Sequence, residues 1–188
     1  MKRAIICVFA CALLLTAGVI AQSNKHFTKD GLSFDYPEGW NVTDESSSDA
    51  QQLTLSRGDS EVLIKLFVHR GKTNTPEKLA QAKTKIIDPY LNYTEKQFEQ
   101  MGAKPQRVAA TTQVGGAEAE GVRITATLDE PGEAGVYWTA VGERLVVLTF
   151  FGPDKARNKA TPTWDAVRNS LKIEAPAPKA SPSPKPKP

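Results

Sequence analysis

The sequence has 188 residues, of which 40% are hydrophobic, 7% aromatic and 24% charged. These proportions are typical of a globular protein with one domain, and they exclude a long coiled coil, a collagen-like rod and a polytopic membrane protein. The formal net charge of +3 falls to +1 without Lys2 and Arg3, and to −2 without the three lysines after residue 174. The body of the chain therefore has no basic stripe, and no nucleic-acid partner is expected.

The first 21 residues have the pattern of a secretory signal peptide. Two basic residues precede an apolar stretch over residues 4–15. Small or medium-sized side chains occupy the positions that signal peptidase recognises. We expect cleavage after Ala21 and a secreted or periplasmic protein; an uncleaved anchor is the alternative, although the stretch is short for a membrane span. Both cysteines, Cys7 and Cys11, lie in this segment, so the mature chain has no disulfide.

Residues 175–188 form a tail of different composition. Six of these 14 residues are proline and none is large and apolar. Such a segment cannot bury enough surface to offset the entropy of ordering, so a disordered, extended tail is expected. Its lysines could contact anionic polymers of the cell envelope, and a solubilising spacer is the simpler alternative. The folded domain is therefore expected over residues 22–174.

The first half of this domain alternates apolar and polar residues between turns. Residues Leu32–Tyr36 are predicted to form a strand that ends in a turn. Residues 51–57 and 60–69 are predicted to pair as a hairpin, with Gly58 and Asp59 as a two-residue loop. Apolar residues line one face of the second strand, and two more indicate partial cover of its other face: Val62, Ile64, Leu66 and Val68, then Leu63 and Phe67.

Two further hairpins are predicted, one with its loop at residues 115–116 and one with its loop at residues 142–143. The first joins strands over residues 107–114 and 117–128. The strand after the second loop, residues 144–151, is apolar on both faces. A strand of that kind is typical of a central position with cover on each side.

Two helices are predicted, one between these groups of strands and one after them. The first begins at Pro76 after a capping threonine, and Pro89 is expected to kink it or to restart it with Asp88 as a new cap. The second is expected to begin at Pro162 with Thr161 as its cap. Apolar residues at spacings of three and four form their buried faces: Leu79, Ala82, Ile86, Tyr90, Phe98 and Met101, then Trp164, Val167 and Leu171. This order predicts class α+β, an antiparallel sheet covered by helices.

Four segments occur in a familiar combination: Phe34–Trp40, the hairpin after it, the helix from Pro76, and Trp164–Ile173. Together they resemble the PsbP-like superfamily over residues 27–173. That superfamily includes the extrinsic PsbP subunit of the photosynthetic oxygen-evolving complex, secreted bacterial domains and a Ran-binding nuclear protein. The resemblance implies an α-β-α sandwich on an antiparallel sheet, and it implies no single activity. No metal-binding motif of the photosynthetic members matches positions here, so no metal or cofactor is expected.

Residues suited to catalysis or metal binding are few. His26 and His69 have neither the spacing of a zinc site nor the frame of a Ser-His-Asp hydrolase around them. Glu118 and Glu120 share one face of a predicted strand, with three more carboxylates beyond it: Asp129, Glu130 and Glu133. Such a cluster could hold calcium, and solvated side chains are the plain alternative. An enzyme that uses these groups would need them to converge in one cleft.

Five aromatic side chains near strand ends and helix starts remain as candidates for a site. They belong either to the core or to a groove between the sheet and the first helix: Tyr36, Trp40, Tyr90, Trp138 and Trp164. Without a catalytic constellation, the sequence predicts a non-enzymatic binding or accessory module that contacts a protein of the cell envelope. A carrier of an apolar small molecule or lipid in that groove is the alternative.

Overall fold

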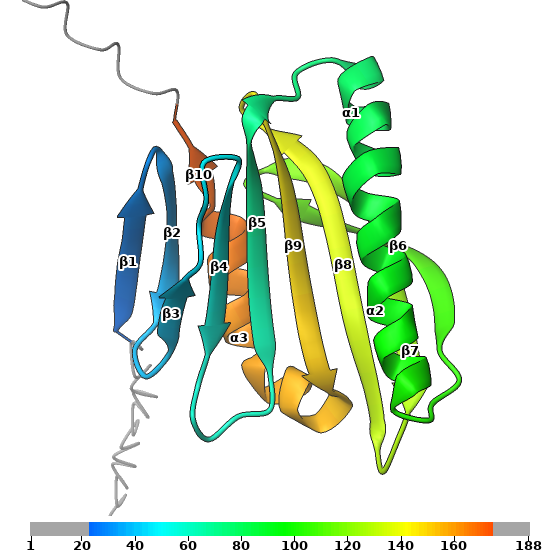
Figure 1. Cartoon of the computed structure of the whole chain (residues 1–188). Helices are drawn as coiled ribbons and strands as arrows, with labels where there is room; N and C mark the ends of the chain where they lie inside the picture. Colours follow the sequence, from blue (N-terminus) through cyan, green and yellow to red (C-terminus); the bar gives the residue numbers. More distant parts are fainter. Residues whose placement is uncertain (1–22, 175–188) are drawn as a thin grey trace, which may run out of the picture.

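A seven-stranded sheet forms the centre of the molecule (Figure 1). The structure is a computed structural model that describes residues 23–174, so the predicted signal peptide and tail lie outside the described residues. The strands of this sheet are β3 (Asn41–Asp44), β4 (Ala50–Ser56), β5 (Leu63–Lys72), β6 (Gln106–Val114), β7 (Ala117–Thr127), β8 (Pro131–Val141) and β9 (Arg144–Pro153). Their order is β3-β4-β5-β9-β8-β7-β6, and every neighbouring pair is antiparallel.

A smaller sheet stands beside the first. It consists of β1 (Asn24–Lys29), β2 (Leu32–Pro37) and β10 (Lys172–Ile173), in the order β1-β2-β10. The strand predicted from Leu32 is confirmed, but it belongs to this sheet and not to the larger one. Pro37 ends it, and Gly39, with a φ of +88°, turns the chain toward β3.

Helices cover both faces of the seven-stranded sheet (Figure 1). On one face, α1 (Pro76–Ala82), the π-helical turn η1 (Lys83–Ile87) and α2 (Asp88–Gln100) form one continuous segment. On the other face, α3 (Asp154–Ser170) packs against both the large sheet and β2. This α-β-α arrangement confirms the predicted α+β class. No helix within residues 23–174 is long and apolar enough to cross a membrane.

The buried apolar side chains form one cluster on each face of the large sheet. Alternate residues of β5, such as Ile64 and Leu66, face α3, and alternate residues of β8, such as Val136, face α2. Residues 145–150 of β9 are buried without interruption. Strand β9 lies between β5 and β8, which confirms the central position predicted from its two apolar faces.

The three predicted hairpin loops differ in outcome. The loops at residues 115–116 and 142–143 are confirmed as tight connections, and Gly115 and Gly116 take φ values of +58° and +79°. The predicted two-residue loop at Gly58 is wrong, because Ser56 pairs with Leu63 across a six-residue connection. Gly58 is not among the described glycines with positive φ, and a tight hairpin turn depends on that conformation.

The first predicted helix is confirmed at both ends but differs in the middle. Thr75 caps it by accepting a hydrogen bond from the Lys78 backbone N–H at 3.3 Å, and Gly102 follows its last turn with a φ of +89°. The helix does not restart with a cap at Asp88. Instead, the Asp88 N–H donates to the Lys83 carbonyl, five residues earlier, so a wider π-helical turn precedes Pro89. Met101, expected on the buried face, is 51% exposed.

The second predicted helix is longer than expected. It begins at Asp154, so Thr161 and Pro162 lie inside α3 and do not start it. Thr161 donates its hydroxyl hydrogen to the Arg157 carbonyl at 3.1 Å, within the helix. The predicted inward residues of this helix are confirmed, since Trp164, Val167 and Leu171 are all buried. Pro162 is tolerated although it cannot donate a helical hydrogen bond.

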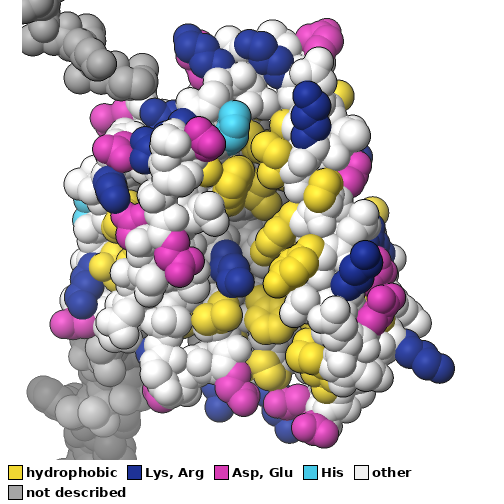
Figure 2. All heavy atoms as spheres, in the orientation of Figure 1, with side chains coloured by type: hydrophobic (Ala, Val, Ile, Leu, Met, Phe, Trp, Pro, Cys, Tyr) yellow, Lys and Arg dark blue, Asp and Glu magenta, His cyan; other side chains and the backbone are white. Residues whose placement is uncertain are grey.

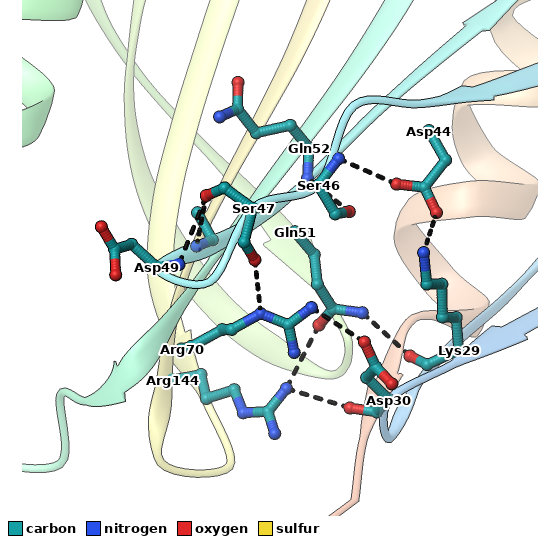
Figure 3. A network of polar contacts seen from close by, with 11 residues as sticks. Lys29, Asp30, Asp44, Ser46, Ser47, Asp49, Gln51, Gln52, Arg70 and Arg144 are labelled. Carbon is teal, nitrogen blue, oxygen red and sulfur yellow. Dashed lines mark hydrogen bonds and ion pairs between the residues drawn. The ribbon is translucent and has the colours of Figure 1, made fainter.

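A polar network joins the two sheets (Figure 3). The fully buried Gln51 of β4 donates to the Lys29 carbonyl at 2.9 Å, and its side-chain oxygen accepts from Arg144 at 3.2 Å. Arg70 pairs with the Asp30 carboxylate at 2.8 Å. The turn between β1 and β2 is therefore held against β4, β5 and β9 by side chains from three strands.

One ion pair in this network predicts acid sensitivity. The hydrogen bond from Lys29 to Asp44, at 2.6 Å, lowers the pKa of Asp44 from 3.8 to about 2, with help from Ser46. Because the folded pKa is depressed, the stabilisation is present above about pH 4 and is lost as the pH falls toward 2. We expect Asp44→Asn to lower the free energy of unfolding by about 0.5 kcal/mol at pH 7 and by nothing measurable at pH 2.

Urea denaturation at the two pH values measures this difference. Asp129→Asn, a change in the exposed loop after β7, is the control and should leave the free energy of unfolding unchanged at both. If Asp44→Asn and the unmodified chain lose the same free energy on acidification, the pair does not contribute.

Candidate functional site

A groove lies between the helical segment α1–η1–α2 and the part of the large sheet that this segment leaves open. It has a volume of about 330 Å³. Figure 2 shows hydrophobic side chains gathered in a hollow between β5 and the helix. Strands β4, β5 and β9 supply its floor, and η1 and the start of α2 supply one wall.

The floor and wall of the groove are largely apolar. Phe67 of β5 and Val147 of β9 are paired neighbours in the sheet and lie on its floor. Ile86 and Tyr90 project from the helical segment. The Tyr90 hydroxyl lies 3.2 Å from Thr149 Oγ1, which ties the helix to the sheet at one side of the groove. Phe67 is only partly buried, so its ring remains accessible in the groove.

The opposite rim is polar, and strand periodicity explains why. Successive strand residues point to opposite faces, so Leu53 and Leu55 of β4 and Leu66 of β5 enter the core on the α3 side. The residues between them face the groove: Gln52 and Thr54 on β4, and Lys65 on β5. Glu45 completes this rim. The groove therefore combines an apolar floor with an open edge that carries both charges.

The five predicted aromatic residues do not form one site. Tyr36, Trp40 and Trp164 belong to the cluster on the α3 side, whereas Tyr90 and Trp138 belong to the cluster on the α2 side. Of the five, only Tyr90 lines the groove. Phe67, which the sequence indicated only as evidence of partial cover, is the aromatic residue of the groove floor.

Three of these aromatic residues are core side chains. Trp40 is 2% exposed, with the Arg57 guanidinium 5.7 Å from its ring centre. Trp164 stacks on Phe150 at a centroid distance of 5.0 Å. Trp138 is 4% exposed and faces Lys83. Their packing accounts for their burial without a ligand.

The other candidate groups are also dispersed. His26 pairs with Asp35 at 2.6 Å on the small sheet, and His69 Nδ1 accepts from the Gly71 N–H at 3.1 Å on β5. Glu120 is 70% exposed on the α2 face and lies 4.0 Å from a lysine of η1. Within residues 23–174, no three His, Cys, Asp or Glu side chains are grouped as a metal site would require.

One carboxylate is buried, and the sequence does not reveal it. Glu133 of β8 is 2% exposed on the α3 side, between Arg157 of α3 at 2.6 Å and Arg123 of β7. The Glu133 carboxylate raises the pKa of Arg123 by hydrogen bonding and charge. Because Glu133 faces α3 and Glu120 faces α2, the predicted acidic cluster is divided by the sheet. Glu133 acts as a link between sheet and helix.

Solved structures similar to this one share its fold. The solution structure of cyanobacterial PsbP (CyanoP) from Synechocystis sp. PCC 6803 matches with a TM-score of 0.51 and 14% identity, over 84% of this chain and 96% of that one. A crystal structure from Bacteroides thetaiotaomicron VPI-5482 matches with a TM-score of 0.51 and 13% identity, over 81% of this chain and 49% of that one. No protein-family model and no curated protein matches the sequence. The fold predicted from the resemblance is confirmed.

Proposed function

From the PsbP-like fold as premise, we propose that this chain is a non-enzymatic binding module that receives an apolar side chain of a partner protein in the groove at Phe67. The fold itself specifies no activity, so the proposal depends on the site. The observation that carries it is an accessible apolar floor beside a polar rim. Protein interfaces have this composition, with a desolvated anchor at the centre and polar groups around it.

The residues that line the groove favour a partner segment over an enzymatic substrate. The charged residues Glu45 and Lys65 of the polar rim can pair with polar groups of a partner next to an inserted side chain. The two histidines, which would be the natural general bases, lie outside the groove lining. The buried Glu133 is occupied by two arginines on the opposite side of the sheet.

The cellular location belongs to the same proposal. The basic start and the apolar stretch over residues 4–15 support export, with cleavage after Ala21. A mature chain without cysteine suits an oxidising compartment. The partner is therefore a protein of the cell envelope, and the tail after residue 174 could add contacts to anionic envelope polymers.

The test of this function changes the groove floor alone. Phe67→Lys is expected to weaken partner binding by about 2 kcal/mol, or about thirtyfold, because it removes the apolar anchor. Leu63→Lys is the matched control: Leu63 lies on the same face of β5 but outside the groove lining. A photo-reactive residue at the exposed rim position Gln52 reports binding as cross-link yield in native envelope fractions.

A second photo-reactive variant, at the exposed Lys155 on α3, gives the background. The expected result is a cross-linked partner from position 52 that disappears with Phe67→Lys and persists with Leu63→Lys. Equal yields from positions 52 and 155, or a yield that Phe67→Lys does not change, would contradict the proposal.

An apolar small molecule is the second candidate occupant. The volume of about 330 Å³ lies at the small end of the range for ligand pockets, roughly 300–1,000 Å³. Native mass spectrometry of the freshly purified chain distinguishes the two occupants. A retained small molecule that is lost on Phe67→Lys supports the carrier, whereas a bare chain that cross-links a partner supports the binding module.

A further inference from the structure

The two sheets end in strands of very different character. The large sheet ends at β3, with four residues, and at β6, with nine. The small sheet ends at β10, with two residues, and at β1, which carries Lys25 and Lys29. Short strands and lysines are the usual means by which proteins prevent pairing at sheet edges. Strand β6 has neither protection, and Arg107 is its only charged residue.

The free backbone groups of β6 can be identified from its hairpin. Val114 and Ala117 flank the two-residue loop, so they form a hydrogen-bonded pair and direct their backbone groups toward each other. Because such pairs alternate along the ladder, Arg107, Ala109 and Thr111 direct their N–H and C=O groups away from β7. The next outward carbonyl, that of Gln113, accepts a hydrogen bond from Arg168 of α3 at 3.2 Å. The free edge therefore spans residues 107–111.

The side chains along this edge leave room for another strand. Ala109 and Thr111 are small and exposed, and Val108 is 52% exposed on the opposite face. Arg107 is held by Glu95 at 2.6 Å and Asn92 at 2.8 Å, both on α2. The lone charge of the strand is thus compensated within the molecule, and the edge has no net charge that would repel a second strand.

We propose that β6 pairs with β6 of a second copy of this chain, antiparallel and about a two-fold axis through Ala109. In this register Ala109 faces Ala109 of the second copy, and Arg107 faces Thr111 in both directions. The three pairs supply about six backbone hydrogen bonds and extend the sheet across both molecules. The register uses every free outward group and ends before the Gln113 carbonyl that Arg168 occupies.

Charge favours a second copy as the occupant. Thr111 pairs with Glu120 of β7, and both side chains lie on the α2 face. Arg107 of one copy would therefore lie opposite Thr111, with the exposed Glu120 one strand further on the same face. The pairing brings no like charges into opposition, because Arg107 of each copy is already paired with Glu95 and lies opposite the uncharged Thr111.

Disulfide trapping tests the register directly. In full-length chains with Cys7→Ser and Cys11→Ser, Ala109→Cys should form a disulfide-linked dimer on oxidation. Residues of a hydrogen-bonded antiparallel pair have Cα atoms about 5.5 Å apart, within the range for a disulfide. Thr111→Cys is the matched control on the same edge: the two copies of residue 111 would lie about 14 Å apart. We expect at least tenfold more dimer from Ala109→Cys.

Sedimentation equilibrium on the full chain without new cysteines gives an independent measurement. A monomer–dimer equilibrium is expected, and Ala109→Lys should raise its dissociation constant at least tenfold by placing two lysines opposite each other. Circular dichroism checks that this variant remains folded, as expected for an exposed edge position. Equal trapping from positions 109 and 111, or a dimer unaffected by Ala109→Lys, would overturn the proposal. A monomer that loses cross-linking to an envelope protein on Ala109→Lys would overturn it too, and would assign the edge to that protein.

Discussion

Glu133→Gln is expected to lower the free energy of unfolding by about 3 kcal/mol, a large fraction of the stability of a domain this size. Glu133 is 2% exposed, and the Arg157 side chain beside it is 15% exposed. The variant keeps the shape of the side chain but removes the carboxylate charge 2.6 Å from Arg157, so this guanidinium keeps only the longer contact to Asp154 at 3.8 Å. Burial of a charge that has lost its close partner is costly because water no longer solvates it. Urea denaturation at pH 7 measures the difference.

Two control variants separate this cause from a general loss of charge. Arg123→Gln removes the other partner, whose side chain is 50% exposed, and should cost only about 1 kcal/mol. Glu130→Gln, three residues earlier in the loop, should leave the free energy of unfolding within about 0.5 kcal/mol of the unmodified chain. If all three variants have similar stability, Glu133 is not the link between the sheet and α3.

Trp164→Ala should lower the free energy of unfolding by about 4 kcal/mol. Trp164 is 7% exposed, stacks on Phe150 with an interplanar angle of 5°, and lies 5.7 Å from the Tyr137 ring centre. Its removal leaves a cavity between α3 and the large sheet, which the surrounding rings can fill only partly. The melting temperature should fall by about 10 °C, since 1 kcal/mol corresponds to about 2–4 °C at this chain length.

Trp164→Phe is the graded control for this cavity. It keeps an aromatic ring against Phe150 and should recover at least half of the loss. Differential scanning calorimetry compares the three chains. A melting temperature for Trp164→Ala within a few degrees of the unmodified chain would mean that α3 is not anchored by this stack.

The fold was largely predictable because its central elements have strong local signals. Strand β9 has apolar residues on both faces, a pattern that indicates a central strand covered on each side. The glycine pair at 115–116 adopts the positive φ values that a tight hairpin needs. Strand β1 was missed because Phe27 is the only apolar residue in a segment that forms an exposed edge. A lone apolar residue gives no periodicity to detect.

The site was harder to predict because it depends on which face each residue occupies. Tyr137 and Trp138 are neighbours in sequence, but strand alternation sends them to opposite sides of the sheet. The groove arises because the helical segment α1–η1–α2 covers only part of one face of the large sheet. No local sequence pattern shows how much of that face a helix will cover. Glu133 and Arg157 are 24 residues apart, so their pairing appears only once α3 is placed against β8.

The pairing of β10 with β2 has a consequence for how the molecule is made. Ile173 lies opposite Leu32, so the hairpin at the beginning of the domain receives its third strand from the last residues of the domain. Contacts of such long sequence separation form slowly, because the entropy of closing the intervening loop precedes their gain. The N-terminal hairpin therefore gains its third strand only after residue 173 has been synthesised, and until then the nascent chain lacks the contact that closes the small sheet.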